Sequence, residues 1–142
     1  MQFFVTELTN GAFVHKVEGQ ILESAGFTKL GEKYKGHYDE EMEWVTKFID
    51  RTLDLGGEVK GEDRPSVPLV SDPVKYVKYD LQRQREGLEV LRKCLSEVHD
   101  DPTTYDILKA YLKDEEDDLY WSENALELIE KLGEQNWLLT QL

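Results

Sequence analysis

Three stretches of the sequence place an acid or an amide in the middle of apolar residues that recur at helical spacing. The interrupting residues are Glu41, Gln84 and Glu115. The stripes run Tyr34, Tyr38, Glu41, Val45, Phe48, Thr52, Leu55; Val77, Leu81, Gln84, Leu88, Leu91, Leu95; and Leu108, Tyr111, Glu115, Leu119, Ser122, Leu126, Ile129. A carboxylate removed from water shares a proton, finds a cation or binds a metal. In helix bundles, inward carboxylates bind metal ions.

Five helices are expected to position these groups. Helical periods and capping residues predict helices over residues 2–25, 28–55, 73–99, 102–132 and 134–142. Asp72 before Pro73 and Asp101 before Pro102 are favourable starts for the third and fourth helices. The face predicted for the first helix consists of Phe3, Glu7, Asn10, Val14, Val17 and Ile21.

The connection from Gly56 to Asp72 is long for a compact domain. It holds about seventeen residues with three glycines and two prolines and shows no helical period. A connection of this length can cross the whole height of a bundle. Two antiparallel helix pairs joined by one long crossover form the ferritin-like version of the four-helix bundle.

Composition limits the classes of function. The chain of 142 residues fits a single domain, 1–142, and its net charge of −13 argues against nucleic acid as a partner. Cys94 is the only cysteine, so no internal disulfide forms and a cytoplasmic location is expected. No signal peptide, membrane span, glycine-rich phosphate loop or nucleophilic triad is apparent. His15, His37 and His99 lack metal-ligand spacing, so we expect them on the surface or in loops.

Two segments give the sequence a specific family resemblance. EEMEWVTKFIDRTLDLGG (40–57) resembles the second helix of bacterioferritins, and YLKDEEDDLYWSENALELIEKLGEQNWLLTQL (111–142) resembles their fourth helix and C-terminal tail. Asp80, Leu81 and LRKCL (91–95) align with the third helix. The resemblance covers nearly all of the chain and fades before Lys29. It implies an all-α fold, a ferritin-like four-helix bundle with a long crossover and a short fifth helix.

The resemblance also implies a set of metal ligands. Glu41 and Glu115 match the two carboxylates that bridge the metals in the family, and Glu7, in TEL, matches the first-helix carboxylate with about one residue of insertion. Three other positions depart from the pattern. Trp44 and Asp118 stand where histidines are expected, and Gln84 stands where the third helix has a glutamate.

These departures predict a degenerate or single-metal site with at most weak ferroxidase activity. Asp118 can still ligate a metal and Gln84 can do so weakly through its carbonyl oxygen, whereas Trp44 cannot. The alternative is that Glu41, Gln84 and Glu115 form a hydrogen-bond network with one shared proton. Met42 matches the methionine that binds haem across a two-fold axis in bacterioferritins, and plain packing is the alternative for this residue.

The expected function is iron storage or detoxification by a shell that self-assembles or co-assembles with a related subunit. The fifth-helix segment resembles the tail that lines the four-fold channels of 24-subunit shells, and the acidic composition suits ferrous iron as cargo. A non-catalytic ferritin-like bundle that binds no metal is the second hypothesis. A ferritin-like enzyme with another metal or oxidant, such as peroxide, is the third.

Overall fold

The computed structural model describes all 142 residues and contains five α-helices and no strand. The helices are α1 (Gln2–Ser24), α2 (Thr28–Asp54), α3 (Pro73–Glu97), α4 (Pro102–Leu132) and α5 (Glu134–Leu139). Their order and lengths confirm the predicted all-α fold. None of the helices is both long and apolar enough to cross a membrane. The chain forms two compact units, Met1–Ser71 with Gln141–Leu142, and Asp72–Thr140.

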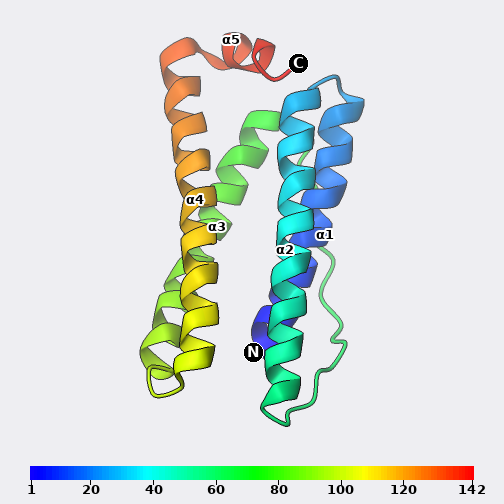
Figure 1. Ribbon diagram of the computed structural model, residues 1–142. Helices are drawn as coiled ribbons and strands as arrows, with labels where there is room; N and C mark the ends of the chain where they lie inside the picture. Colours follow the sequence, from blue (N-terminus) through cyan, green and yellow to red (C-terminus); the bar gives the residue numbers. More distant parts are fainter. The chain divides into compact units, whose positions relative to one another are not determined.

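In the first unit, α1 and α2 form an antiparallel hairpin (Figure 1). Gly26 turns the chain between them with a φ of +97°, which a residue with a Cβ rarely adopts. The two helices lie in close contact at Gly19 and Gly31. A Cβ added at Gly31 would lie 2.7 Å from the carbonyl oxygen of Gly19. Glycine at both positions therefore lets the two backbones pack directly against each other.

The buried face of α1 differs from the predicted face. Of the six predicted positions only Val14 is buried, and Phe3 is 51% exposed. The buried face consists mainly of Phe4, Leu8, Ala12, His15, Glu18 and Leu22. The prediction was wrong by about one residue of register, because His15 and Glu18 belong to the buried face and make it look polar in the sequence.

The connection between α2 and α3 lies along α1. Gln2 exchanges two hydrogen bonds with the backbone of Lys60, at 2.8 and 2.9 Å, and the Thr6 hydroxyl donates to Glu62 at 2.7 Å. Further along α1, Glu18 accepts a hydrogen bond from the Val70 amide at 2.6 Å. Later residues of the connection contact later residues of α1, so the connection runs in the same direction as α1. This path crosses the height of the hairpin, as its length predicts.

The second unit consists of the α3–α4 hairpin and α5 (Figure 1). Both predicted N-caps are present: Asp72 accepts from the Lys75 amide at 2.9 Å, and Asp101 accepts from the Thr104 amide at 3.2 Å. All six stripe positions of α3 are buried. Leu81 and Leu88 pack with Leu119 of α4 in one apolar cluster. The predicted stripes therefore hold this hairpin together.

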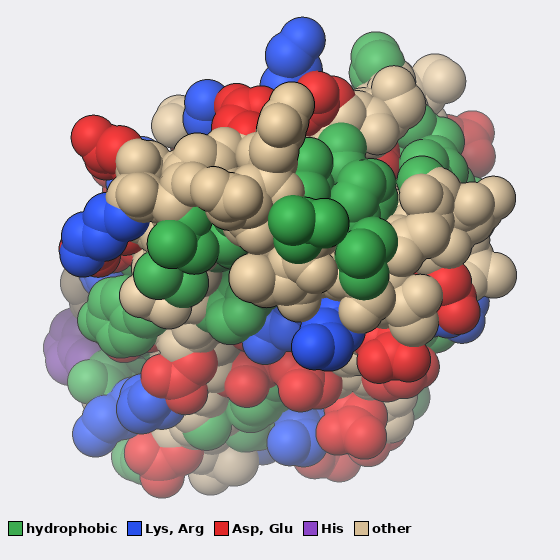
Figure 2. All heavy atoms as spheres, turned by 90° about the horizontal axis from the view of Figure 1, so that it is seen from above, with side chains coloured by type: hydrophobic (Ala, Val, Ile, Leu, Met, Phe, Trp, Pro, Cys, Tyr) green, Lys and Arg blue, Asp and Glu red, His purple; other side chains and the backbone are tan.

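α5 follows α4 after a sharp turn at Gly133, whose φ is +82°. It ends at Leu139, three residues before the predicted end. Trp137 anchors α5 and is 2% exposed, whereas Leu139 is 66% exposed. The view from above in Figure 2 shows hydrophobic side chains among acidic and basic ones. The acidic excess is thus interspersed with Lys and Arg on this surface.

Candidate metal centre

Glu41 lies in the core of the first unit and contacts His15. The distance from Glu41 Oε2 to His15 Nδ1 is 2.8 Å, and the two residues are 6% and 7% exposed. α2 presents Glu41 from the middle of its apolar stripe, and α1 presents His15 from its buried face. A carboxylate can only accept, so Nδ1 carries the hydrogen of this bond. Glu41 is a predicted bridging ligand, and one of its two carboxylate oxygens therefore already accepts a hydrogen bond from His15.

Tyr34 and His37 surround this pair. The His15 ring stacks on Tyr34 with centroids 5.7 Å apart and meets the His37 ring edge-on at 5.3 Å. Tyr34 is 0% exposed and His37 is 2% exposed. The expectation of surface or loop positions was wrong for His15 and His37. His15 lies on the buried face of α1, and His37 lies on the buried face of α2. The expectation is confirmed for His99, which is exposed beyond the end of α3.

Glu7 occupies a different environment from the one predicted for a buried ligand. It is half-buried and forms an ion pair with Arg64 of the connection. The deeply buried carboxylate of α1 is Glu18, which is 1% exposed and receives the Val70 amide. The sequence prediction missed Glu18, although a stripe drawn one residue later through Phe4 and Leu8 would have reached it.

In the second unit, Gln84 lies in the core beside Asp80. The Gln84 amide nitrogen donates to Asp80 Oδ2 at 3.1 Å, one helical turn away on α3, and the two residues are 8% and 4% exposed. Gln84 Oε1 is buried and accepts no hydrogen bond. A buried carbonyl oxygen of this kind needs a donor, a water or a cation. Gln84 therefore fits the role of a weak oxygen ligand, and Asp80 is a buried acid that the predicted ligand set omits.

The remaining predicted ligands of this unit lie one turn apart on α4. Glu115 and Asp118 are both half-buried. Neighbouring acids of the DEEDD run have surface partners: Asp117 accepts from Lys113 at 2.5 Å, and Glu116 accepts from the Tyr120 hydroxyl at 3.2 Å. These hydrogen bonds raise the pKa of Lys113 and of Tyr120 above their ordinary values. Two of the five acids at 114–118 thus have partners outside the predicted ligand set.

Trp44 and Met42 are half-buried residues of α2. The Trp44 ring stacks on Phe48 with centroids 6.2 Å apart, and Lys47 Nζ lies 4.1 Å from the Trp44 ring centroid. A cation over the indole face is a favourable contact, and the indole has no lone pair to offer a metal. The Met42 thioether sits on a helix face that is neither fully buried nor fully exposed. This position suits either packing or a haem contact shared with a second copy.

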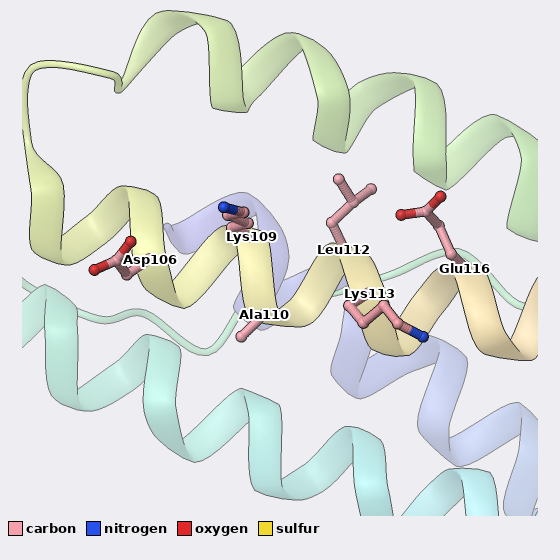
Figure 3. A pocket seen from close by; sticks show the side chains of 6 residues that line it. All are labelled: Asp106, Lys109, Ala110, Leu112, Lys113 and Glu116. Carbon is pink, nitrogen blue, oxygen red and sulfur yellow. The ribbon is translucent and has the colours of Figure 1, made fainter.

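A surface hollow of about 500 Å³ lies along α4. Figure 3 shows the six side chains that line it, all from α4: Asp106, Lys109, Ala110, Leu112, Lys113 and Glu116. Lys113 in this lining is already paired with Asp117. The hollow brings together none of the predicted ligands, so we assign it no role in metal chemistry.

Comparison with known proteins identifies the family. A ferritin-like domain matches residues 20–132, and the chain therefore belongs to the ferritin-like family. It is 35% identical to a bacterial ferritin of Neisseria meningitidis serogroup B, over 98% of this chain and 94% of that protein. It is also 34% identical to a bacterial ferritin of Pseudomonas aeruginosa, over 92% and 84% of the two chains. A bacterioferritin of Streptomyces coelicolor is 29% identical over 94% and 81%. The resemblance seen in the two sequence segments is confirmed.

Proposed function

We propose that this chain is an iron-storage shell subunit of the bacterioferritin kind whose dinuclear site is partly degenerate. The observation that carries the proposal is that two predicted ligand positions keep oxygen donors in the core: Glu41 is buried in the first unit, and Gln84 Oε1 is buried in the second and accepts no hydrogen bond. The family membership of the chain supports storage as the function, and the identity of Trp44 and Asp118 supports the loss of oxidation.

The proposed ligands for ferrous iron are Glu41, Gln84, Glu115 and Asp118. Carboxylates are hard oxygen donors that bind ferrous iron without help from imidazole. The set lacks the two imidazoles of a complete site, so we expect it to hold two irons less well. Glu7 forms an ion pair with Arg64, and this ion pair must break before Glu7 can bind the metal. The expected result is binding of ferrous iron with slow oxidation.

Storage requires assembly. We propose that the chain builds a closed shell, either alone or together with a related subunit that has the complete set of metal ligands. Three leucines of the second unit, from the end of α4 onward, are 39–66% exposed: Leu128, Leu132 and Leu139. Exposed apolar side chains of this kind suit a symmetric contact between copies. A cytoplasmic location is part of this proposal and rests on the single cysteine.

Haem binding through Met42 is the remaining part of the proposal. Two copies that meet across a two-fold axis would each contribute one thioether. The test is the visible spectrum of purified protein and of Met42→Ala. A haem band that disappears in Met42→Ala supports the assignment, and an unchanged band rules out Met42 as the ligand.

Iron retention by the assembled protein tests the storage proposal. The protein is loaded with ferrous iron in air and separated by size, and iron and protein are measured in each fraction. We expect hundreds of iron atoms per particle to travel with a species many times the 16.5 kDa subunit. Iron found only with small species, or as free precipitate, would contradict storage by this chain alone. Repeating the loading with a complete bacterioferritin subunit added then tests co-assembly.

The second candidate function is a ferritin-like bundle that binds no metal. The observation in its favour is that His15 and Asp80 already contact two of the proposed ligands, Glu41 and Gln84. In that case the polar core only specifies how the helices pair. Shells or oligomers that retain no iron in the loading experiment would favour this function.

A further inference from the structure

His15 and His37 bring two imidazoles together in the core of the first unit. A ring nitrogen of each lies within 4.8 Å of one on the other. They come from different helices, α1 and α2, and are 7% and 2% exposed. Two buried imidazoles this close bring four polar nitrogens into one part of the core, and buried polar nitrogens need partners, as Glu41 is for His15 Nδ1. Neither residue belongs to the ligand set discussed above.

Glu41 fixes which nitrogen of His15 points away from the carboxylate. Nδ1 donates to Glu41 Oε2 at 2.8 Å, so a neutral His15 ring carries its lone pair on Nε2. A carboxylate that receives one ring N–H of a histidine, while the other nitrogen binds a metal, is the common arrangement in metalloproteins. The hydrogen bond thus sets both the tautomer and the orientation that a metal ligand needs.

The ring geometry also suits one shared cation. Two imidazoles on one tetrahedral ion, with metal–nitrogen bonds of about 2.0–2.1 Å, place their centroids roughly 5 Å apart. The His15 and His37 centroids are 5.3 Å apart, with the ring planes at 78°. Tyr34 packs against both rings, at 5.7 and 5.6 Å, and restricts their rotation.

We propose that His15, through Nε2, and His37 together bind one divalent first-row transition cation that prefers imidazole, such as Zn²⁺. Glu41 is a positioning residue in this site and not a ligand. Oxygen ligands complete the coordination. The site goes beyond the proposed storage function, because it uses the two buried histidines and does not require oxidation, shell assembly or Glu115.

Cobalt binding to the full-length, metal-free protein tests the site. Co²⁺ in a low-coordinate site with imidazole ligands absorbs visibly, and competition with Zn²⁺ gives the zinc affinity. We expect His15→Ala and His37→Ala to weaken zinc binding by about 100-fold or more, and Glu41→Ala by about 10–100-fold. Glu41→Gln keeps an oxygen acceptor for Nδ1–H and should weaken zinc binding less than Glu41→Ala does. His99→Ala, an exposed histidine, is the matched control and should change nothing.

Two outcomes would overturn the site. One is a cobalt spectrum that survives in His15→Ala and His37→Ala but is lost in Glu115→Ala, which would place the ion with the acidic ligands. The other comes from the wild type and needs no variant to fold: spin-echo spectra of the Cu²⁺-loaded protein should show two coordinated imidazoles, and none or one would contradict the assignment. Iron retention is measured separately, so failure of this site leaves the storage proposal standing.

Discussion

Two side chains limit the chemistry that we propose for the dinuclear site. Trp44 carries an indole that cannot donate electrons to a metal, and its ring is occupied by contacts with Phe48 and Lys47. Asp118 offers a carboxylate where the family resemblance implies an imidazole. Imidazole suits iron, whereas carboxylate suits hard cations in general. The identity of these two residues, more than the fold, therefore sets the expected rate of iron oxidation.

Restoring the histidines should restore activity. The double substitution Trp44→His/Asp118→His supplies both imidazoles to the retained carboxylates Glu41 and Glu115. We expect the initial rate of ferrous oxidation in air to rise at least tenfold above that of the wild type. The rate is followed as ferric absorbance at fixed protein concentration.

The matched control for this gain is Trp44→Phe/Asp118→Asn. It removes the indole and the carboxylate without adding an imidazole, so its rate should not exceed that of the wild type. An equal rise in both double variants would mean that space or charge, and not the imidazole, limits the reaction.

At the level of the elements, the α1–α2 hairpin depends on glycine where the backbones meet. A Cβ at Gly31 would lie 2.7 Å from the Gly19 oxygen and 3.0 Å from the Glu23 nitrogen. Both neighbours are backbone atoms, so the contact cannot be relieved by a side-chain rotation. The hairpin presents His15 and Glu41 to each other, and its spacing therefore affects the polar core directly.

Substitution of Gly31 tests this close contact. Gly31→Ala should lower the free energy of unfolding by about 1–3 kcal/mol, the usual cost of forcing extra atoms into a packed contact. Gly36→Ala, in the same helix, meets no atom within 4 Å. It should raise the free energy by about 0.5–1 kcal/mol, because alanine favours the helix over glycine. Urea unfolding followed by circular dichroism measures both; destabilisation of equal size in both would contradict the packing argument.

The fold was largely predictable from the sequence because its signals are local. Apolar spacing and the N-caps Asp72 and Asp101 placed every helix to within one to three residues of its observed ends. The buried face of α1 was not predictable in the same way. Its polar members, His15 and Glu18, are stabilised by partners 26 and 52 residues away in the sequence, and no local pattern reveals such contacts.

The candidate site was also predictable only where its signals are local. The burial of Glu41 and Gln84 was correctly predicted from their stripes, but their partners His15 and Asp80 were not. Asp80 and Gln84 are four residues apart on α3, so the spacing that places them side by side was visible in the sequence. The choice of Glu7 as a ligand stays a prediction, and its ion pair with Arg64 depends on the path of the long connection.

For the whole molecule, assembly is the property on which storage depends. The second unit exposes Leu128, Leu132 and Leu139, whereas Trp137 of α5 is buried. A contact between copies would remove these leucines from water.

A charge placed on this surface should prevent assembly and spare the fold. We expect Leu139→Glu to elute as a species much smaller than the wild type, with an unchanged circular dichroism spectrum. Gln135→Glu, which adds a charge at another exposed position of α5, should assemble normally. Light scattering coupled to size-exclusion chromatography gives both masses. A full-sized shell formed by Leu139→Glu would show that α5 does not make the contact.

The most direct measurement of the central claim is ferrous oxidation in air by metal-free wild-type protein, compared with Glu41→Ala/Glu115→Ala and with buffer. The proposal of a partly degenerate site predicts a wild-type rate only modestly above buffer, lost in the double variant. A fast rate that the double variant abolishes would show a competent ferroxidase and contradict the claim. A rate equal to buffer in both proteins would leave a shell or interaction subunit whose buried acids are structural.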